Sequence, residues 1–206
     1  MSTTYFQNMT IKASSQNQPT TVKGASTRER IVIVARQRLI QNGIENFALR
    51  EIADSLGIKL GNLQYYFQNK EALILHVLEA EAAKDRQIID ERLDQDASAQ
   101  VAFRHIVSDL TSRWRGESGI LFSTLGTLAM HNKEYAALYR KIYLDFYQAL
   151  ELPLRKLKPE LDTAELQMRS RLITALIDGA PMQPRIPNKT AFIQRVQDQA
   201  ESIALA

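Results

Sequence analysis

The side chains with the clearest potential for recognition lie in LGNLQYYF, residues 60–67, where two amides and three aromatic rings follow one another closely. A second short segment, LREIADSL at residues 49–56, precedes it, and Gly57 separates the two. Each segment is too short to be a stable helix alone, because isolated helices below about 12–15 residues are marginal in water. Tyrosines on so short an element suggest that its outer face contacts a partner.

Residues that usually carry catalysis are scarce in this chain. It has no cysteine, only three histidines (His76, His105 and His131), no nucleophile motif and no phosphate-binding glycine loop. His105 and Asp109 have the i, i+4 spacing of a metal pair but lack a third ligand, so a hydrogen bond on the helix surface is the better interpretation. We therefore expect no enzyme, no cofactor and no metal site.

The two short segments fit a helix-turn-helix, in which each helix braces the other. Ala53 is small enough for a close helix contact, and Gly57 tolerates the positive φ of a sharp turn. Both helices supply apolar anchors, at Ile52, Leu56, Ile58 and Leu63. The second helix can then project its remaining side chains into the major groove of DNA.

Nearly all of the chain from Ser26 onward is expected to be helical. Ser26 and Glu29 have the spacing of a capping box, and Gly43 would end the first helix. Further helices are predicted at 49–56, 60–67, 70–93, 99–115, 118–131, 133–152, 162–179 and 190–204, with a break between Pro153 and Pro159 and a loop at GAPMQPRIPN. No segment alternates like a strand, so we expect an all-α protein of about nine helices.

Composition favours a soluble cytoplasmic protein: 45% of the 206 residues are hydrophobic, and no run of 18 apolar residues could cross a membrane. The polar residues 1–25 lack the apolar core of a secretory signal and are expected to be a disordered tail. Residues 1–70 hold 9 Lys and Arg against 4 Asp and Glu, whereas residues 71–206 hold 17 against 19. A basic N-terminal third suggests a polyanionic partner, although chance clustering of charges explains it equally well.

Residues 27–73 resemble the DNA-binding region of the tetracycline-repressor (TetR) family of bacterial transcriptional regulators. The resemblance rests on TRERIVIVARQRLIQNG, LREIADSLGI and GNLQYYFQNKEAL, which combine three helices with their spacing and the Tyr66-Phe67 pair. It implies a DNA-binding domain at residues 26–70 and a helical effector-binding and dimerisation domain at residues 71–206.

In proteins of this family, polar residues of the third helix meet phosphates and base edges of operator DNA. The contacts implied here are Thr27, Arg50, Lys59, Leu60, Gly61, Asn62, Gln64, Tyr65, Tyr66 and Lys70, whereas Phe67 should pack inward. Asn62 and Gln64 have the amide groups that pair with adenine, and Arg50 could pair with guanine. For each of these residues the alternative is a solvated surface side chain.

Three positions depart from the family pattern. Ala48 and Lys59 stand where Ser or Thr usually caps the second and third helices, and loss of such a cap typically costs about 0.5–2 kcal/mol. Lys59 also places positive charge at a positive helix end, which a nearby phosphate would relieve. Gln64 replaces the commoner tyrosine, which leaves the operator sequence open.

The family dimerises through its last two helices, and both carry apolar stripes in this chain. The interface is expected to include Leu166, Ile173, Leu176, Ile177, Phe192 and Val196, the alternative being that both stripes pack within one subunit. A homodimer would place two recognition helices in successive major grooves, about 34–36 Å apart or multiples of that distance.

The family also holds a small-molecule effector among its middle helices. The candidate lining is His105, Trp114, Phe122, Met130, Tyr139, Tyr143 and Phe146, although aromatic stripes at helical spacing are more often core. The expected function is a dimeric repressor released from operator DNA when an effector tilts the fourth helix. The alternative is a helical DNA-binding or partner-binding protein without an effector.

Overall fold

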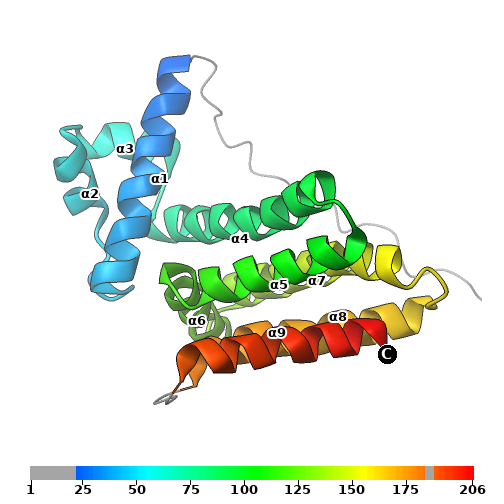
Figure 1. Ribbon diagram of the computed structural model, residues 1–206. Helices are drawn as coiled ribbons and strands as arrows, with labels where there is room; N and C mark the ends of the chain where they lie inside the picture. Colours follow the sequence, from blue (N-terminus) through cyan, green and yellow to red (C-terminus); the bar gives the residue numbers. More distant parts are fainter. Residues whose placement is uncertain (1–21, 184–187) are drawn as a thin grey trace, which may run out of the picture.

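The computed structural model describes residues 22–183 and 188–206, and the regular secondary structure of this part of the chain is helical throughout. The helices are α1 (Val22–Asn42), α2 (Leu49–Leu56), α3 (Leu60–Tyr66), α4 (Lys70–Gln95), α5 (Ala99–Trp114), α6 (Glu117–Ala129), α7 (Lys133–Leu157), α8 (Thr163–Gly179) and α9 (Lys189–Leu205), with a 3-10 turn η1 (Ala180–Met182) after α8 (Figure 1). The all-α prediction is confirmed.

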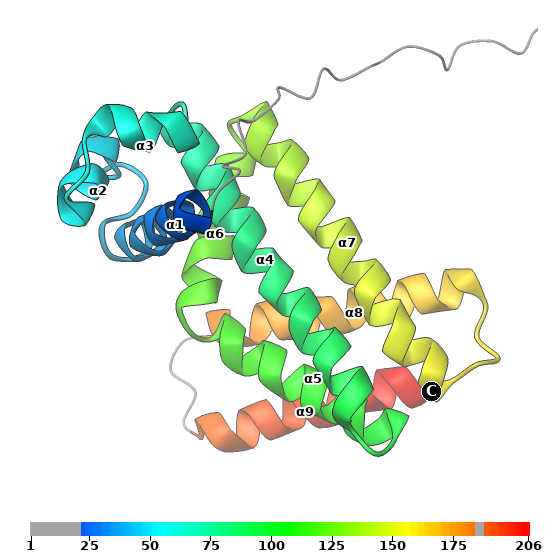
Figure 2. The same cartoon turned by 90° about the horizontal axis from the view of Figure 1, so that it is seen from above.

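Helices α1, α2 and α3 form a small head at one end of the molecule, and the remaining helices form a larger body (Figure 1). The first turns of α4 pack against α1 in the head, and the rest of α4 runs through the body against α5 and α7 (Figure 2). Helices α8 and α9 pack together along the side of the body beyond α5 and α7. A long helix shared by both parts can carry a displacement from one to the other.

The head is held by apolar side chains that belong to the same core cluster as those of the body. Its fully or nearly fully buried side chains are Ile31, Ala35, Leu39, Phe47, Ile52, Ala53, Leu63, Phe67, Leu73 and Ile74. These residues come from α1, the loop after it, α2, α3, the residue that follows α3, and the start of α4. Helix α2 contributes only two buried residues and α3 only one. Both helices therefore depend on α1 and α4 for their stability.

Two predicted helix limits differ from the structure by more than two residues. Helix α1 begins at Val22, so Ser26 lies inside the helix and its predicted role as a cap does not apply. Once a helix is nucleated, each further residue adds one hydrogen bond at small cost, and no proline interrupts residues 22–25. The tail predicted for residues 1–25 otherwise lies outside the described residues.

Helix α7 continues to Leu157 and contains Pro153, which was predicted to break it. Proline lacks the N–H that would bond one turn back, which normally kinks or ends a helix. Here Leu150 and Leu154 are fully buried on either side of Pro153, which is itself buried. Packing of this turn against the body therefore outweighs the lost hydrogen bond. No helix among the described residues is long and apolar enough to cross a membrane.

Candidate nucleic-acid interface and ligand cavities

The turn between α2 and α3 has the geometry that the sequence predicted. Gly57 adopts φ 66° and ψ 30°, in the left-handed region, and its N–H donates to the Asp54 carbonyl at 3.1 Å. The next amide, of Ile58, donates to the Ala53 carbonyl at 3.0 Å. Ala53 is 1% exposed, so a larger side chain could not fit where the helices approach. The helix-turn-helix is confirmed.

Helix α3 is fixed from one side only. Leu63 is fully buried in the head core and Phe67 is 4% exposed, as predicted, whereas Gly61, Asn62, Gln64 and Tyr65 face solvent. Neither the Asn62 nor the Gln64 side chain forms a hydrogen bond with another described residue, so their amides are available to an external partner. The outward face of α3 therefore presents donors, acceptors and a glycine that leaves the backbone open.

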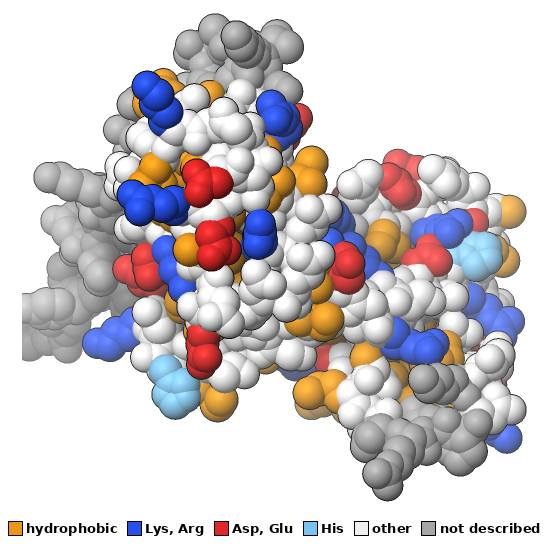
Figure 3. Space-filling view, turned by 90° about the vertical axis from the view of Figure 1, so that its left-hand side faces the viewer, with side chains coloured by type: hydrophobic (Ala, Val, Ile, Leu, Met, Phe, Trp, Pro, Cys, Tyr) orange, Lys and Arg blue, Asp and Glu red, His pale blue; other side chains and the backbone are white. Residues whose placement is uncertain are grey.

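Positive charge lies beside this face. Arg50, in the first turn of α2, and Lys59, immediately before α3, are both exposed. Ala48 and Lys59 occupy the N-cap positions of α2 and α3 without a side-chain cap, which confirms the predicted departures. On the face of the molecule shown in Figure 3, the head carries blue basic and red acidic side chains intermingled.

The remaining predicted DNA contacts are partly engaged within the head. Lys70 Nζ donates to the Ile44 carbonyl and lies 5.9 Å from the centre of the Phe47 ring, so it ties the loop after α1 to the start of α4. Tyr66 is half-buried, with its ring edge-on to Tyr65 at 5.2 Å between centroids, and Leu60 is half-buried. Thr27 lies in α1, also half-buried. Lys70 thus has a structural role whether or not it also meets a phosphate.

A second contact fastens α1 to α4 near the recognition helix. Arg28 Nη1 lies 2.9 Å from His76 Nε2, and its guanidinium lies 5.1 Å from the centre of the Phe67 ring. The rings of Phe67 and His76 are 5.3 Å apart. Burial and the nearby Arg28 charge lower the pKa of His76. The neutral imidazole is therefore the form that suits this junction.

A buried ion cluster joins the head to the body, and we define it as Arg36, Glu81, Asp85 and Arg113. Glu81 is 1% exposed and accepts from Arg36 Nε at 2.8 Å, Arg113 Nη2 at 2.7 Å and Ser118 Oγ at 2.6 Å. Asp85, 2% exposed, accepts from Arg113 Nε at 2.5 Å. Arg36 comes from α1, both carboxylates from α4, Arg113 from α5 and Ser118 from α6, so four helices meet at this cluster.

The two carboxylates of the cluster differ electrostatically. Burial is the largest influence on both and favours the neutral acid. At Glu81 the hydrogen bonds from Arg36 and Ser118 and the charge of Arg113 together outweigh burial and lower the pKa to about 2. At Asp85 burial prevails over Arg113 and raises the pKa to about 6. The surroundings of Glu81 therefore favour its ionised form, while those of Asp85 favour the neutral acid.

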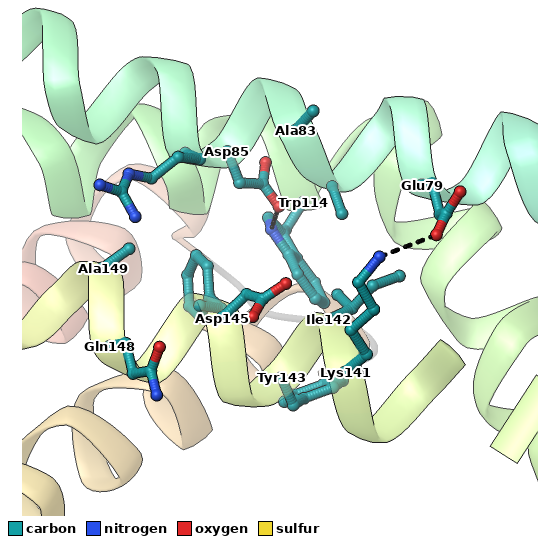
Figure 4. Close-up of a pocket in the computed structure, with 13 residues that line it drawn as sticks. Glu79, Ala83, Asp85, Trp114, Lys141, Ile142, Tyr143, Asp145, Gln148 and Ala149 are labelled. Atoms are coloured by element: carbon teal, nitrogen blue, oxygen red, sulfur yellow. Dashed lines mark hydrogen bonds and ion pairs between the residues drawn. The ribbon is translucent and has the colours of Figure 1, made fainter. Parts of the chain in front are cut away.

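Asp85 also lines a cavity between α4 and α7, the α4–α7 cavity, of about 340 Å³. Figure 4 shows Asp85 directed toward the Trp114 indole, whose Nε1 donates to it at 3.2 Å, and Lys141 directed toward Glu79. The Lys141 Nζ to Glu79 Oε1 distance is 3.0 Å. The apolar part of the cavity wall is formed by Phe146, Tyr143 and Ala149. Asp85 is thus the member of the buried ion cluster that lines this cavity.

A second cavity of about 650 Å³ lies on the other side of Trp114 and Tyr143, bounded by α6, α7, the end of α8 and η1. We call it the α6–α8 cavity. Trp114 is stacked on Phe122 with 4.4 Å between centroids and 11° between planes, and Tyr139 lies 4.5 Å from Tyr143. Asp178 is the carboxylate in its lining. Both volumes lie within the range of small-molecule sites, about 300–1,000 Å³.

Five of the seven predicted effector residues line one or both cavities, namely Trp114, Phe122, Tyr139, Tyr143 and Phe146. His105 and Met130 line neither. His105 is exposed and its Nδ1 contacts Asp96 at 3.0 Å, while Asp109 pairs with Arg92, so the expected His105–Asp109 bond is wrong. Met130 follows the end of α6 and is 72% exposed. Among the described residues no three His, Asp or Glu side chains are grouped to hold a metal.

The predicted dimer residues divide into two sets. Leu166, Ile173 and Ile177 are fully buried within one chain, so their prediction as interface residues is wrong: that stripe of α8 serves the body's own core. Leu176, Phe192 and Val196 instead line a surface hollow of about 430 Å³ between α8 and α9, together with Ala175 and Gly179. The outer side of α8 continues this face with two exposed apolar side chains, Met168 and Leu172.

The residues that sequence reasoning missed are mostly buried polar ones. Glu81 and Asp85 continue the four-residue spacing between Val77 and Ile89, so charged residues stand in the middle of a buried stripe. Asp178 continues the same spacing from Thr174 on α8. Carboxylates at core positions of a helix were the available signal for both sites.

The chain is similar to known regulators in sequence and in fold. Residues 31–77 match the family model of bacterial regulatory proteins of the tetR family. The chain is 25% identical over 159 residues to the HTH-type transcriptional regulator UidR of Escherichia coli K12, covering 74% of this chain and 79% of that protein. A transcriptional regulator from Saccharomonospora viridis, solved in complex with choline, has a TM-score of 0.70 at 21% identity, covering 86% of this chain and 96% of that one. A TetR transcriptional regulator from Legionella pneumophila has a TM-score of 0.70 at 18% identity, covering 85% and 96%.

Proposed function

The chain belongs to the tetR family of bacterial regulatory proteins and is a transcriptional regulator, and we propose that it acts as a homodimeric repressor that a small-molecule effector releases from operator DNA. The observation that carries this proposal is a chain of side-chain contacts that links the cavities of the body to helix α1 of the head. Asp85 and Trp114 line the cavities, and Arg113 and Glu81 connect them to Arg36 on α1. We propose no catalytic activity.

DNA recognition is assigned to the outward face of α3 with the positive charges beside it. Asn62 and Gln64 would read base edges in the major groove, where an amide can pair with adenine N6 and N7. Gly61 would allow the backbone to approach the duplex, and Arg50 and Lys59 would contact phosphates or guanine. These side chains are exposed, and α3 packs against the rest of the head only through its opposite side, which supports the assignment.

Dimerisation is assigned to the face of α8 and α9 that surrounds the hollow at Leu176 and Phe192. Met168 and Leu172 are 56% and 48% exposed and lie on one side of α8 with Leu176, at four-residue spacing. Burying such side chains against a second copy removes apolar area from water, and small Ala175 and Gly179 would allow close helix approach. A two-fold dimer would present two α3 helices to one operator.

Effector response is assigned to the body cavities. A ligand that moved Trp114 or Asp85 would disturb Arg113, which donates to both carboxylates of the ion cluster, and through Glu81 would alter the contact with Arg36. The choline bound by the Saccharomonospora viridis regulator supports the expectation that a body of this fold accepts a small molecule. A ligand releases DNA only in so far as it binds the released conformation more tightly.

The test begins with selection of duplexes from a random library by the full-length protein. We expect two-fold symmetric sites with half-site centres one helical turn apart, about 10 base pairs, or a multiple of that. Asn62→Ala and Gln64→Ala should each relax preference at one base pair per half-site by about 1–3 kcal/mol without changing the circular dichroism spectrum. Absence of any selected sequence, or base preference unaffected by both changes, would contradict the DNA assignment.

The dimer is tested with a charge placed on the α8 face. Leu172→Asp should give a folded monomer by sedimentation and should weaken operator binding strongly, because one head alone engages only a half-site. Leu144→Asp is the matched control, since Leu144 is 51% exposed on α7, away from the α8–α9 hollow. A Leu172→Asp protein that remained dimeric would show that the interface lies elsewhere on the molecule.

Operator binding that no small molecule alters would favour a DNA-binding protein without an effector.

A further inference from the structure

Asp178, on the last turn of α8, has one carboxylate oxygen without a partner. Tyr143 Oη donates to its Oδ2 at 2.8 Å. Its Oδ1 is buried and accepts no hydrogen bond from any described residue; among buried side-chain oxygens and nitrogens of the described chain it alone is left so. A buried acceptor without a donor is costly and rare in folded proteins, so this oxygen requires an explanation.

The neighbouring polar residues of α8 show how a buried polar side chain usually finds its hydrogen-bond partner. Thr174 Oγ1 donates to the Ser170 carbonyl at 2.7 Å, and Ser170 Oγ donates to the Gln167 carbonyl at 3.0 Å, both within the helix. In its ionised form the carboxylate has no proton to donate, so Asp178 cannot use its own helix in this way. Its second oxygen needs a donor from outside α8.

The cavity that Asp178 lines has the walls of a cation site. Trp114, Phe122 and Tyr139 present ring surface to the α6–α8 cavity, and aromatic faces attract ammonium groups through their negative π-clouds. Arg115 is the basic residue in the described lining, and its side chain is exposed to solvent. The cavity lining thus combines an unpaired carboxylate oxygen with aromatic surface.

We propose that the α6–α8 cavity binds a small organic cation, a protonated amine whose ammonium N–H donates to Asp178 Oδ1 while its hydrocarbon part lies against the aromatic walls. The proposal rests on the proposed function, because it names the chemical class of the effector. A metal ion is a poor alternative, since hard cations need several oxygen ligands and no such group of side chains occurs among the described residues.

The electrostatics of the site agree with a cationic ligand. Burial raises the pKa of Asp178 to about 7, the Tyr143 hydrogen bond opposes this, and the charge of Asp85 on α4 adds to it. An ammonium in contact would favour the ionised carboxylate and displace its proton. The other titratable groups in the lining are Tyr139 and Tyr143 from α7 and the exposed Arg115, whereas α6 and η1 contribute none among the described residues. Affinity for an amine should therefore increase as pH rises through about 7.

Trp114 is the only tryptophan in the chain and lines both cavities, so its fluorescence reports ligand binding, and the variants of Asp178 and Asp145 distinguish the two cavities. The probes are 2-phenylethylammonium, the neutral 2-phenylethanol and the anionic phenylacetate, which share one skeleton and differ in charge. We expect saturable quenching by the ammonium with affinity about tenfold or more above that of the alcohol, and weaker binding still of the acid. Equal or tighter binding of the alcohol or the acid, or no saturation by the ammonium up to about ten millimolar, would overturn the proposal.

Asp178→Asn should reduce the affinity for the ammonium to about that of the alcohol and leave the affinity for the alcohol unchanged, which shows that the cavity is intact. Asp145→Asn is the matched control: it removes the same charge from an exposed position on α7, in the lining of the other cavity, and should keep the preference for the cation. A preference that survives Asp178→Asn would overturn the assignment to Asp178. Neither measurement uses DNA, so failure of operator binding would end the regulator proposal while leaving this result standing.

Discussion

Glu81 on α4 holds Arg36 of α1 through two hydrogen bonds, Nε to Oε2 at 2.8 Å and Nη2 to Oε1 at 3.2 Å. The carboxylate is 1% exposed, so the pair lies where water screens it little. The same carboxylate accepts from Arg113, whose Nε binds the cavity-lining Asp85. A buried carboxylate therefore links α1 of the head, through Arg113, to a residue of the cavity wall.

Glu81→Gln should destabilise the protein by about 3–5 kcal/mol, because it leaves Arg36 and Arg113 partly buried without their shared anion. Urea denaturation at neutral pH measures this loss. The matched control is Asp90→Asn, which removes the exposed Arg86–Asp90 pair of the same helix and should cost no more than about 0.5 kcal/mol. Equal effects of the two changes would mean that the cluster does not anchor the head.

Gly61→Ala should separate DNA binding from stability. A Cβ at Gly61 would meet nothing within 4 Å, and alanine is the better helix former, so the free energy of unfolding should stay the same or rise by up to about 1 kcal/mol. If the α3 backbone approaches DNA at this point, operator affinity should fall by about tenfold. Fluorescence anisotropy on the selected duplex gives the affinity, and an unchanged value would show that the backbone stays clear of the groove.

Arg50→Ala and Lys59→Ala should each lower the slope of log affinity against log salt by about one, as expected for the loss of one phosphate contact. Lys59→Ala should also stabilise the fold slightly, since it removes positive charge from the N-terminus of α3. Lys156→Ala, at the exposed far end of α7, is the control that removes equal charge and should leave the slope unchanged. A control slope that falls equally would indicate a non-specific effect of net charge.

Gly119→Ala should distort the α6–α8 cavity. A Cβ at Gly119 would lie 2.0 Å from the Trp114 carbonyl oxygen, so α6 would have to move away from the end of α5. The expected cost is about 1–3 kcal/mol, with a shifted Trp114 emission spectrum. Gly126→Ala on the same helix is the control, because its Cβ would lie 3.7 Å from the Tyr139 ring, an ordinary contact. Identical emission from the two variants would argue against the close approach at Gly119.

The head was predictable from sequence because its constraints are local. Gly57 adopts a conformation that favours glycine, and Ile52 and Leu63 lie within a few residues of it, so turn and anchors are visible together. The uncapped positions at Ala48 and Lys59 could be identified for the same reason.

The body was less predictable because its site is assembled from residues far apart in sequence. Arg36 and Glu117 are brought together at 2.6 Å across 81 positions, and no local pattern encodes such a contact. Periodicity located the apolar stripe of α8 but not which side a second copy would cover, so the fully buried Ile173 was assigned to the interface. Likewise the aromatic rings of the cavities were identified as a class, whereas the carboxylate of Asp178 among them was missed.

His76 should make the junction of head and body sensitive to mild acid. Its pKa is lowered from 6.5 by burial and by Arg28, against a smaller opposite effect of Glu79, so below about pH 6.5 the unfolded chain takes up a proton that the folded chain resists. Stability contributed by the neutral imidazole is therefore present above pH 6.5 and lost as pH falls through the lowered pKa. Asp85 and Asp178, whose pKa values are raised, act in the opposite direction over this range, so the wild-type curve alone is ambiguous.

The difference between wild type and His76→Gln isolates this effect. We expect wild type to lose urea midpoint relative to the variant as pH decreases from about 7.5 to 5.5, because glutamine has no proton to gain. His131→Gln, at an exposed position after α6, serves as the control for replacing a histidine elsewhere. Operator affinity should fall over the same interval in wild type more than in His76→Gln, since Phe67 at the end of α3 packs on the His76 ring. A difference curve that is flat, or that rises toward acid pH, would mean that Arg28 and His76 do not hold the recognition helix in place.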